Sequence, residues 1–394
     1  MARRRPGLRK RLALNIFSDL YASTVAEHRL TTLFWECTLR CNLRCGHCGS
    51  DCTASPDCQD MPAEDFFRVL DRQITPRVDP HRVMVVLSGG EVLVRSDLER
   101  IGRALYDREY PWGMVTNGMA LTPQRFDGLL GAGLHSMTVS IDGFEAEHNR
   151  LRRHPLSFAR AAEAVRMAAA EADACERGVI VQDTAWEGYE KIPSWIMEGY
   201  GTMASEAAEQ LREMAINRPT HVFVQAGVGS LAGAVVGYFT NLYPDNPPTF
   251  VVVECAPAAC LYKGAAAGDG DPRIVDGDMP SVMAGLCCGE PNILGWDILR
   301  NHTTAFVSCP DWVTARGMRT LGAPEKGDPR VISGESGAVT TGLVETLMLD
   351  PEYAELKELI GLDKTSSVLC FSTEGDTDPD QYRRIVWEGE YPTC

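Results

Sequence analysis

Four short apolar segments, each followed by an amphipathic segment, constrain the fold of this chain more than any other feature. Strand, helix, strand, helix is the order that builds a parallel sheet or barrel, and ligands of such folds lie at the carboxyl ends of the strands. We therefore predict an α/β fold for the first part of the chain, with its site at that edge. The expected strands are residues 30–39, 82–88, 112–118 and 135–142.

The segments between these strands carry helix start and stop signals. Residues 62–74 begin with Pro62, which the first turn of a helix tolerates. Residues 95–108 offer Ser96 or Asp97 as an N-cap. Residues 122–133 end in glycine, at Gly131 or Gly133. These signals predict three helices that cross between successive parallel strands.

Cys41, Cys45 and Cys48 directly follow the first expected strand with the spacing C-x3-C-x2-C. Thiolates are the ligands of iron–sulfur clusters, and a four-iron cluster normally takes four of them. Three thiolates from one loop leave one iron open to bind a small molecule. The alternative is a tetrahedral zinc site, in which Cys52 or Cys58 is the fourth ligand, because C-x2-C is also zinc spacing.

The run CNLRCGHC resembles the cluster loop of the radical S-adenosylmethionine (SAM) superfamily, and three more motifs of that family end the later strands. The resemblance implies a 4Fe-4S cluster whose open iron binds SAM, an electron donor that reduces it, and cleavage of SAM to a 5′-deoxyadenosyl radical that attacks a small-molecule or peptide substrate. It also implies cofactor contacts from Gly89, Gly90 and Glu91 of GGE, from Asn117 of TNG, and from Ser140 and Asp142 of SIDG.

These strand-end motifs favour the cluster over zinc, because a zinc site has no use for them. Cys37 lies within the first strand and is expected to be a core residue. The superfamily barrel has six strand–helix units, of which this sequence supplies four. A segment at residues 178–183, GVIVQD, is a conceivable fifth strand.

Residues 221–243, HVFVQAGVGSLAGAVVGYFTNLY, read as a strand, a glycine turn and a helix. Gly227, Val228, Gly229 and Ser230 would then lie at a helix N-terminus, where unpaired backbone N–H groups attract anions. Taken alone, an ordinary tight turn explains this motif equally well.

This motif lies within a longer stretch, roughly residues 176–394. In order along the chain, that stretch contains the runs VIVQDTAWEGYEKIP, AGVGSLAGAVVGY, DMPSVMAGLCCGEPN and SGESGAVTTGL. These runs closely resemble the 2,3-diaminopropionate ammonia-lyase family. Members are pyridoxal 5′-phosphate (PLP) enzymes of fold type II, like the tryptophan synthase β subunit. The resemblance implies that the glycine turn binds the PLP phosphate and that the protein is a homodimer. It also implies roles for Asp183 in proton transfer, Ser372 or Thr373 at the pyridine nitrogen, and Glu335 near the ring.

Each of these residues also has a structural interpretation. Asp183 before Thr184 is a candidate helix N-cap, and residues 372–375 are a candidate strand-end turn. Cys260 with Cys287 or Cys288 is a candidate disulfide, although reduced core thiols are the simpler expectation.

The lysine that the lyase family uses to hold PLP is missing from this sequence. The resemblance places that lysine in the first half of the lyase, where it forms a Schiff base. Before residue 191, Lys10 is the only lysine here. We therefore expect PLP to bind without a covalent bond and the lyase reaction to fail. The remaining lysines are Lys191, Lys263, Lys326, Lys357 and Lys364.

The charge distribution supports two segments of different origin. Residues 1–178 carry 24 Lys and Arg against 23 Asp and Glu, whereas the remainder carries 14 against 31. We expect a partial radical-SAM (βα) barrel at residues 1–172 and the C-terminal half of a PLP fold-type-II α/β domain at residues 176–394. Their join is expected within residues 168–178, a helical stretch without a flexible linker.

Composition excludes several classes of protein. No apolar run approaches the roughly 18 residues that span a membrane, and the basic start of the chain is expected to form an amphipathic first helix. The 14 cysteines without a secretory signal predict reduced thiols in the cytoplasm. We expect neither nucleic-acid nor membrane partners. Three hypotheses remain: a cluster enzyme with a passive second segment, a PLP-dependent lyase, and a joined product without catalysis.

Overall fold

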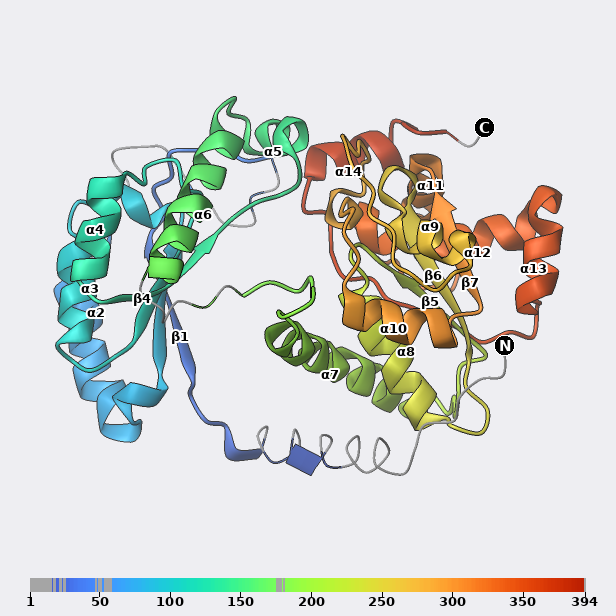
Figure 1. Ribbon diagram of the computed structural model, residues 1–394, viewed down its shortest axis with the longest axis horizontal. Helices are drawn as coiled ribbons and strands as arrows, with labels where there is room; N and C mark the ends of the chain where they lie inside the picture. Colours follow the sequence, from blue (N-terminus) through green and yellow to red (C-terminus); the bar gives the residue numbers. More distant parts are fainter. Residues whose placement is uncertain are drawn as a thin grey trace. The chain divides into compact units, whose positions relative to one another are not determined.

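The computed structural model describes residues 26–46, 59–174 and 181–392, together with the single residues 16, 19, 20, 23, 48, 52 and 179. Two compact units make up the chain (Figure 1), one of residues 27–180 and one that contains the residues from 181 onward. Each unit has its own parallel sheet and its own hydrophobic core. The α/β class predicted from the sequence is therefore confirmed.

The sheet of the first unit has four parallel strands in the order in which they occur along the chain. This order follows when each strand is joined to the next by a helix that returns the chain to the same end of the sheet. The four predicted strands are all present, within a few residues of their expected ends. They are β1 (Thr32–Thr38), β2 (Met84–Gly89), β3 (Trp112–Thr116) and β4 (Leu134–Val139).

Helices connect these strands and lie along the sheet (Figure 1). In α3, the residues Leu98, Ile101 and Leu105 are buried, the spacing of one helical face. Asp97 is the N-cap residue of this helix, as one of the two predicted choices, but its carboxylate makes no cap hydrogen bond and instead accepts from Arg95. The helical elements of this unit are α2 (Ala63–Val69), a π-helical turn (Leu70–Ile74), 3-10 turns (Thr75–Arg77, Pro80–Arg82, Val92–Val94), α3 (Leu98–Tyr106), α4 (Pro123–Gly131), α5 (Glu145–Arg152) and α6 (Ser157–Ala174).

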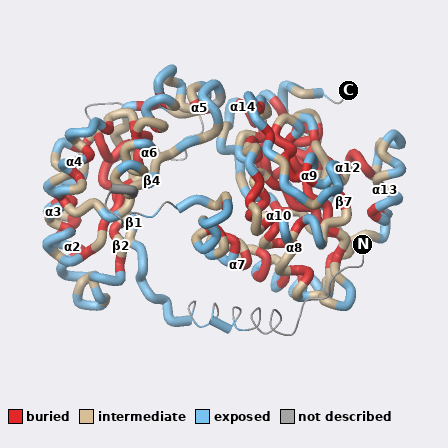
Figure 2. Tube along the Cα trace, in the orientation of Figure 1, coloured by how far each residue is buried: buried red, intermediate tan, exposed pale blue. Residues whose placement is uncertain are grey.

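The core of the first unit lies between the sheet and the helices α2, α3 and α4, where the buried residues of Figure 2 gather. Trp112 of β3 is fully buried, and its indole N–H donates to the carbonyl of Ala132. Trp35 of β1 stacks on Phe66 of α2 with ring centroids 3.9 Å apart. These aromatic contacts hold the strands in place behind the edge that carries the sequence motifs.

The sheet of the second unit is also parallel, with the strand order β7-β6-β5-β8. Every residue of β5 is buried, which is typical of a central strand covered on both faces. Because β5 and β8 are neighbours, the loops that follow them lie at the same edge. The strands are β5 (His221–Gln225), β6 (Thr249–Cys255), β7 (Ala305–Cys309) and β8 (Val368–Cys370).

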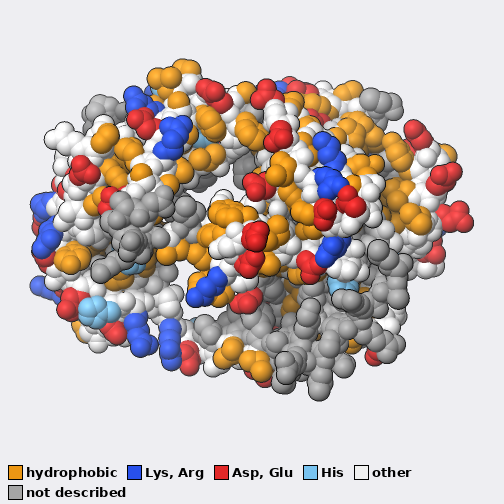
Figure 3. Space-filling model, viewed as in Figure 1, with side chains coloured by type: hydrophobic (Ala, Val, Ile, Leu, Met, Phe, Trp, Pro, Cys, Tyr) orange, Lys and Arg blue, Asp and Glu red, His pale blue; other side chains and the backbone are white. Residues whose placement is uncertain are grey.

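Two groups of helices surround this sheet: α7, α8 and α10 pack on one another, as do α11 and α12. Figure 3 shows acidic side chains at the outer end of the unit, where α13 carries Glu355 and Glu358. The helical elements are α7 (Lys191–Glu213), α8 (Ser230–Leu242), α9 (Cys260–Ala267), α10 (Ile293–His302), α11 (Asp311–Gly322), α12 (Glu335–Leu349), α13 (Ala354–Ile360) and α14 (Pro379–Val386), with 3-10 turns at Ala256–Ala258, Ala284–Leu286 and Pro351–Tyr353.

Two predictions near the start of the second unit are wrong. Residue 179 and residues 181–183 are not in a strand, so the described part of residues 178–183 adds no fifth strand to the first sheet. Asp183 does not cap a helix, because the next helix begins only at Lys191. The predicted join falls partly in α6, while residues 175–178 and the amphipathic first helix predicted before residue 16 lie outside the described residues. No described helix is long and apolar enough to cross a membrane.

Candidate functional site

The four motifs of the first unit lie where the strands of its sheet end. Cys41 and Cys45 follow β1, the GGE motif ends β2, Asn117 follows β3, and Asp142 follows β4. Since all four strands are parallel, these loops meet at one edge of the sheet. The backbone continues this contact beyond the strands: Ser140 N–H donates to the Thr116 carbonyl over 3.0 Å.

Gly89 and Gly90 bring the end of β2 against the cysteine-bearing loop. Gly89 has a φ of 125°, and a Cβ atom there would lie 2.0 Å from the carbonyl oxygen of Thr38. A Cβ atom on Gly90 would lie 2.2 Å from the carbonyl oxygen of Arg40 and 3.2 Å from Cβ of Cys41. Only glycine allows this approach, so the motif fixes where Cys41 stands relative to the second strand.

Glu91 is the buried carboxylate of this edge, with 1% of its surface exposed. It accepts hydrogen bonds from Thr116 Oγ1 at 2.6 Å, from Asn117 N–H at 2.7 Å and from Leu93 N–H at 3.1 Å. Burial raises the pKa of Glu91, and these hydrogen bonds offset that effect only in part. Asn117 also donates from Nδ2 to Asn42 Oδ1 at 2.8 Å. The second strand end, the third strand end and the cysteine-bearing loop thus form one hydrogen-bonded unit.

Cys41 and Cys45 are half-buried and Cys48 is exposed. Burial raises the pKa of both half-buried thiols, and the charge of Cys48 raises both further, so the three sulfurs lie within electrostatic range of one another. Within the described ranges, no three His, Cys, Asp or Glu side chains converge on one metal ion. Cys52 is half-buried, whereas Cys58 lies outside the described residues. The described atoms therefore give no support to the zinc alternative.

Cys37 is a core residue, as predicted. It is 1% exposed, and burial raises the pKa of its thiol to about 12. Its side chain belongs to the hydrophobic core of the first unit, which is typical of an inert structural cysteine.

Arg152 contacts this site although the sequence did not single it out. It is the last residue of α5, and its Nη1 lies 3.8 Å from Cys45 Sγ. Its Nη2 donates to Asp142 Oδ1 at 3.0 Å, and its Nε donates to the other oxygen of that carboxylate. In the same region Gly46 N–H donates to the Leu151 carbonyl over 2.8 Å. The loop after β1 and the loop after β4, on the two outer strands, are joined in this way.

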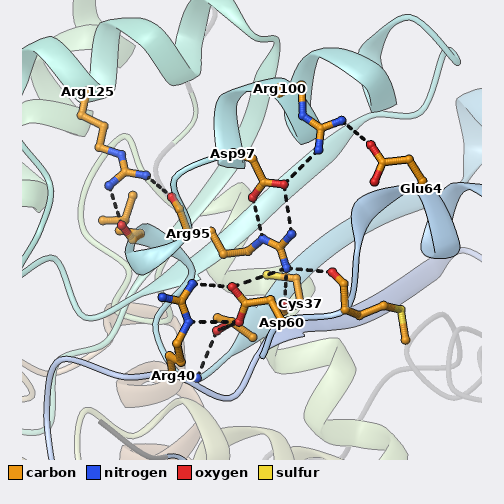
Figure 4. A network of polar contacts seen from close by, with 11 residues as sticks. Cys37, Arg40, Asp60, Glu64, Arg95, Asp97, Arg100 and Arg125 are labelled. Carbon is orange, nitrogen blue, oxygen red and sulfur yellow. Dashed lines mark hydrogen bonds and ion pairs between the residues drawn. The ribbon is translucent and has the colours of Figure 1, made fainter. Parts of the chain in front are cut away.

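A buried ionic network lies at the base of the cysteine-bearing loop (Figure 4). Asp60 accepts from Thr38 Oγ1 at 2.6 Å and from both Arg40 Nε and Nη2. Arg95, only 3% exposed, donates to the carbonyls of Cys37 and Met61. The sequence did not reveal this network, because single Arg and Asp residues in a charged chain give no pattern.

These residues fit an iron–sulfur cluster with bound SAM. The donor set is three thiols from one loop, and each thiolate binds a different iron of a cluster, so the sulfurs need not converge on one point. Gly90 allows the backbone after β2 to pack directly against Arg40 and Cys41 at the start of the cysteine-bearing loop. When present, the cluster would supply the electron that cleaves SAM.

The second site is built around the turn between β5 and α8. Gly229 has a φ of 96° and directly precedes Ser230, the first residue of the helix, and it is closed in by Leu261 and Leu299. This left-handed residue turns the chain so that the N–H groups of the first helical turn face the edge of the sheet. Cys288 lies behind the turn: a Cβ atom on Gly227 would be 3.5 Å from its sulfur.

Asp183 lies beside this turn. Its carbonyl accepts from Ser230 Oγ at 2.7 Å and from Asn292 Nδ2, which also donates to Ser230 Oγ at 2.8 Å. Burial raises the pKa of the Asp183 carboxyl. Burial also raises the pKa values of Tyr200 and Cys288, and the charge of Asp183 raises both further. The Ser230 hydroxyl is therefore engaged with protein groups. An anion at this turn would be bound by its backbone N–H groups.

Ser372 and Thr373 follow β8 at the same edge of the sheet and are exposed. Ser372 Oγ donates to Ser333 Oγ at 2.8 Å, and Gln225 Nε2 donates to Thr373 Oγ1 at 3.0 Å. Gln225 is the last residue of β5 and is 1% exposed, and its Oε1 has no partner among the described residues. The structure thus brings the glycine turn and the residues predicted at the pyridine nitrogen to neighbouring strand ends.

Glu335 is buried at the first turn of α12, 7% exposed, and its carbonyl accepts from Thr314 Oγ1. The N-terminus of this helix is occupied by the Glu374 carboxylate, which accepts from Gly337 N–H at 3.3 Å and from Ser336 N–H. A carboxylate at this position compensates the helix dipole. Glu374, two residues after Ser372, was not identified from the sequence.

The cysteines of the second unit are reduced in the described structure. Cys255 and Cys287 have their sulfurs 3.8 Å apart. The predicted partner Cys260 instead points at backbone oxygens, with its sulfur 3.6 Å from the carbonyl of Cys288. Burial raises the pKa of the Cys260 thiol well above its ordinary value, and the nearby charge of Glu254 raises it further.

The lysines do not supply an anchor for PLP. Lys191, Lys263, Lys326 and Lys364 are exposed, Lys357 is half-buried on α13, and Lys10 lies outside the described residues. Lys191 is engaged with the ring of Trp195, 5.0 Å from its centroid. The residues present fit the phosphate group of PLP at the glycine turn, but no described lysine is buried at that edge to receive its aldehyde.

Two family models match this chain, and the two matches overlap at residues 140–176. Residues 140–356 match the family described as pyridoxal-phosphate dependent enzyme, and residues 35–176 match the radical SAM superfamily. Diaminopropionate ammonia-lyase from Escherichia coli K12 is 53% identical over 212 residues, which are 54% of this chain and 52% of the relative. AdoMet-dependent heme synthase from Methanosarcina barkeri is 35% identical over 127 residues, which are 32% of this chain and 35% of the relative.

The chain also resembles a solved lyase structure. A crystal structure of the E. coli diaminopropionate ammonia lyase superposes with a TM-score of 0.55 and 40% identity, covering 75% of this chain and 68% of that one. This chain spans about half the length of the curated lyase that it matches. The chain therefore belongs to the pyridoxal-phosphate dependent enzyme family, and its residues 35–176 are similar to the radical SAM superfamily.

Proposed function

We propose that the first unit binds a 4Fe-4S cluster through Cys41, Cys45 and Cys48 and uses it to cleave SAM reductively. The observation that carries this proposal is the meeting of four motifs at the ends of four parallel strands, with Glu91 bonded to the third strand end. In this proposal Gly89, Gly90 and Glu91 contact the amino-acid part of SAM, and Asn117, Ser140 and Asp142 line the remainder.

The proposal includes partners and a compartment. An external electron donor reduces the cluster, and a small molecule or peptide receives the radical. Reduced thiols and a reducible cluster need a reducing compartment, so we propose the cytoplasm. Homodimer formation through the second unit follows the lyase family and is part of the same proposal.

Anaerobic reconstitution with ferrous iron and sulfide tests the cluster. We expect about four irons per chain, and 5′-deoxyadenosine after addition of SAM and dithionite. Cys45→Ala should abolish both, whereas Cys370→Ala, which removes a half-buried thiol of the second unit, should change neither. Zinc in place of iron, or an iron-free protein after reconstitution, would refute the proposal.

For the second unit we propose non-covalent binding of PLP through its phosphate at residues 227–230. Support comes from the left-handed Gly229 before α8 and from the 53% identity to the lyase over this region. When bound, PLP would supply an electron-withdrawing ring for bond cleavage next to an amino group. Asp183 would hold or move a proton at that edge.

Borohydride treatment separates this proposal from a working lyase. PLP should bind in equilibrium dialysis and be displaced by inorganic phosphate, but borohydride should leave no pyridoxyl group on any lysine peptide. A trapped lysine adduct, or ammonia release from diaminopropionate at the rate of the full lyase, would show that the second unit is a complete catalyst.

A further inference from the structure

We propose that Arg40 and Asp60 are positioning residues that hold the two ends of the cysteine-bearing loop together and so prepare it for the cluster. This inference rests on the proposed cluster binding of the first unit. Arg40 directly precedes Cys41, and Asp60 follows the last cysteine of the loop, so the 19 residues 41–59 lie between them.

The contact between the two loop ends is a two-point ion pair (Figure 4). Arg40 Nε donates to Asp60 Oδ1 at 3.2 Å, and its Nη2 donates to Oδ2 of the same carboxylate. Thr38 adds a third bond from Oγ1 at 2.6 Å. Paired bonds of this kind fix the direction as well as the distance of the two groups.

Arg95 extends the contact to the GGE motif, which it follows by four residues. Its Nη1 donates to the Met61 carbonyl at 3.2 Å and to the Cys37 carbonyl, and lies 3.9 Å from Asp60 Oδ2. Its Nε and Nη2 hold the carboxylate of Asp97. One buried cation therefore joins the chain before the loop, the chain after it, and the end of β2.

The free energy of cluster binding depends on this arrangement. Bringing the two ends of a loop together lowers the entropy of the chain. When the folded protein already holds the ends together, this entropy is not lost again on cluster binding, and the cluster binds more tightly. The Asp60 side chain is 15% exposed, so water screens the pair less than it screens a surface ion pair. Burial tends to raise the pKa of Asp60, but the bonds and charges of Arg40, Thr38 and Arg95 lower it, so the carboxylate stays ionised.

The test compares Arg40→Gln and Asp60→Asn with Arg108→Gln in the full chain. Arg108 is a matched control, because it forms the same two-point pair with Asp71, at 2.8 and 3.0 Å, away from the loop. The two arginine side chains are also equally exposed, 33% for Arg40 and 34% for Arg108. Asp60→Glu keeps the charge and serves as the conservative variant.

Each protein is reconstituted anaerobically, and release of iron to an excess of chelator is followed in time. We expect Arg40→Gln and Asp60→Asn to release iron about tenfold faster than the unaltered chain, Arg108→Gln to match it, and Asp60→Glu to recover part of the difference. The unfolding temperature of each cluster-free protein is measured alongside, because a role in fold stability alone would make iron release in Arg40→Gln and Arg108→Gln follow their loss of unfolding temperature.

The outcomes are separable. If the unaltered chain takes up no iron, the cluster itself is refuted and this inference falls with it. If the unaltered chain loads and Arg40→Gln releases iron at the same rate, only the positioning role is overturned; equal acceleration by Arg108→Gln overturns it too. Should Asp60→Asn fail to fold, Arg40→Gln decides alone, since it leaves Asp60 its bonds to Thr38 and Arg95.

Discussion

Replacing Gly90 by alanine should separate the second strand end from the cysteine-bearing loop. The new Cβ atom would lie 2.2 Å from the Arg40 carbonyl oxygen, and such atoms essentially never approach closer than 3.0 Å, so the gap must open by at least 0.8 Å. Two backbone bonds cross this gap: Gly90 N–H to the Thr38 carbonyl at 2.8 Å, and Glu91 N–H to the Arg40 carbonyl at 2.9 Å.

The magnitude follows from these contacts. Overpacking of a well-packed site costs about 1–3 kcal/mol. Each weakened backbone hydrogen bond adds about 1 kcal/mol. We therefore expect Gly90→Ala to lower the free energy of unfolding of the first unit by about 3–5 kcal/mol, a large share of the roughly 5–15 kcal/mol of a typical domain. Since Cys41 adjoins the displaced carbonyl, iron uptake on reconstitution should fall as well.

Urea unfolding followed by amide hydrogen exchange measures this change, because peptides from residues 84–116 report on the first unit alone. Gly131→Ala is the matched control: Gly131 is exposed at the end of α4, no atom lies within 4 Å of its new Cβ, and alanine there should be neutral or stabilise by about 0.5–1 kcal/mol. A Gly90→Ala protein within about 0.5 kcal/mol of the unaltered chain, with full iron uptake, would refute the close contact of the two loops.

Two further predictions concern the second unit. Burial raises the pKa of Glu254 from 4.5 to about 7, although the N–H groups of Leu261 and Tyr262 donate to its carboxylate. Between pH 4.5 and 7 the native state therefore binds a proton that the unfolded state has lost, and the free energy of unfolding falls as the pH rises. Glu254→Gln should remove this fall, about 3 kcal/mol between pH 4.5 and 7 in the difference between the two urea-unfolding curves; a flat difference would contradict it. Asn292→Ala should destabilise the unit by about 2–4 kcal/mol in urea, because Asn292 caps α10 and bonds Ser230; a change below about 0.5 kcal/mol would contradict the shared contact.

The fold of the first unit was predictable because its signals are local. Each strand is a short apolar run followed by a helix with one buried face, and the parallel order follows once every strand–helix unit repeats. The placement of the motifs at one edge follows from the same order. The missing side-chain cap of α3 was less predictable, since Arg95 competes with the helix for the Asp97 carboxylate.

The glycine turn of the second unit was also predictable from local sequence, because a left-handed backbone conformation before a helix favours glycine. Asp183 was misplaced as a helix cap for the opposite reason. Its carbonyl is held by Ser230 and Asn292, which lie far along the chain, and no window of sequence around residue 183 contains either partner.

By itself, the sequence determined the chemistry available to this protein: three thiols in one short loop, glycines that let backbones meet, and the absence of a lysine where a PLP lyase of this family would need one. Only the tertiary structure decided how these groups are held. Distant segments meet where Arg40 bonds Asp60, where Arg95 bonds the carbonyls of Cys37 and Met61, and where Arg152 contacts Cys45. Charged side chains are common at every surface, so their pairing has no signature in the sequence; it arises when folding buries particular partners together.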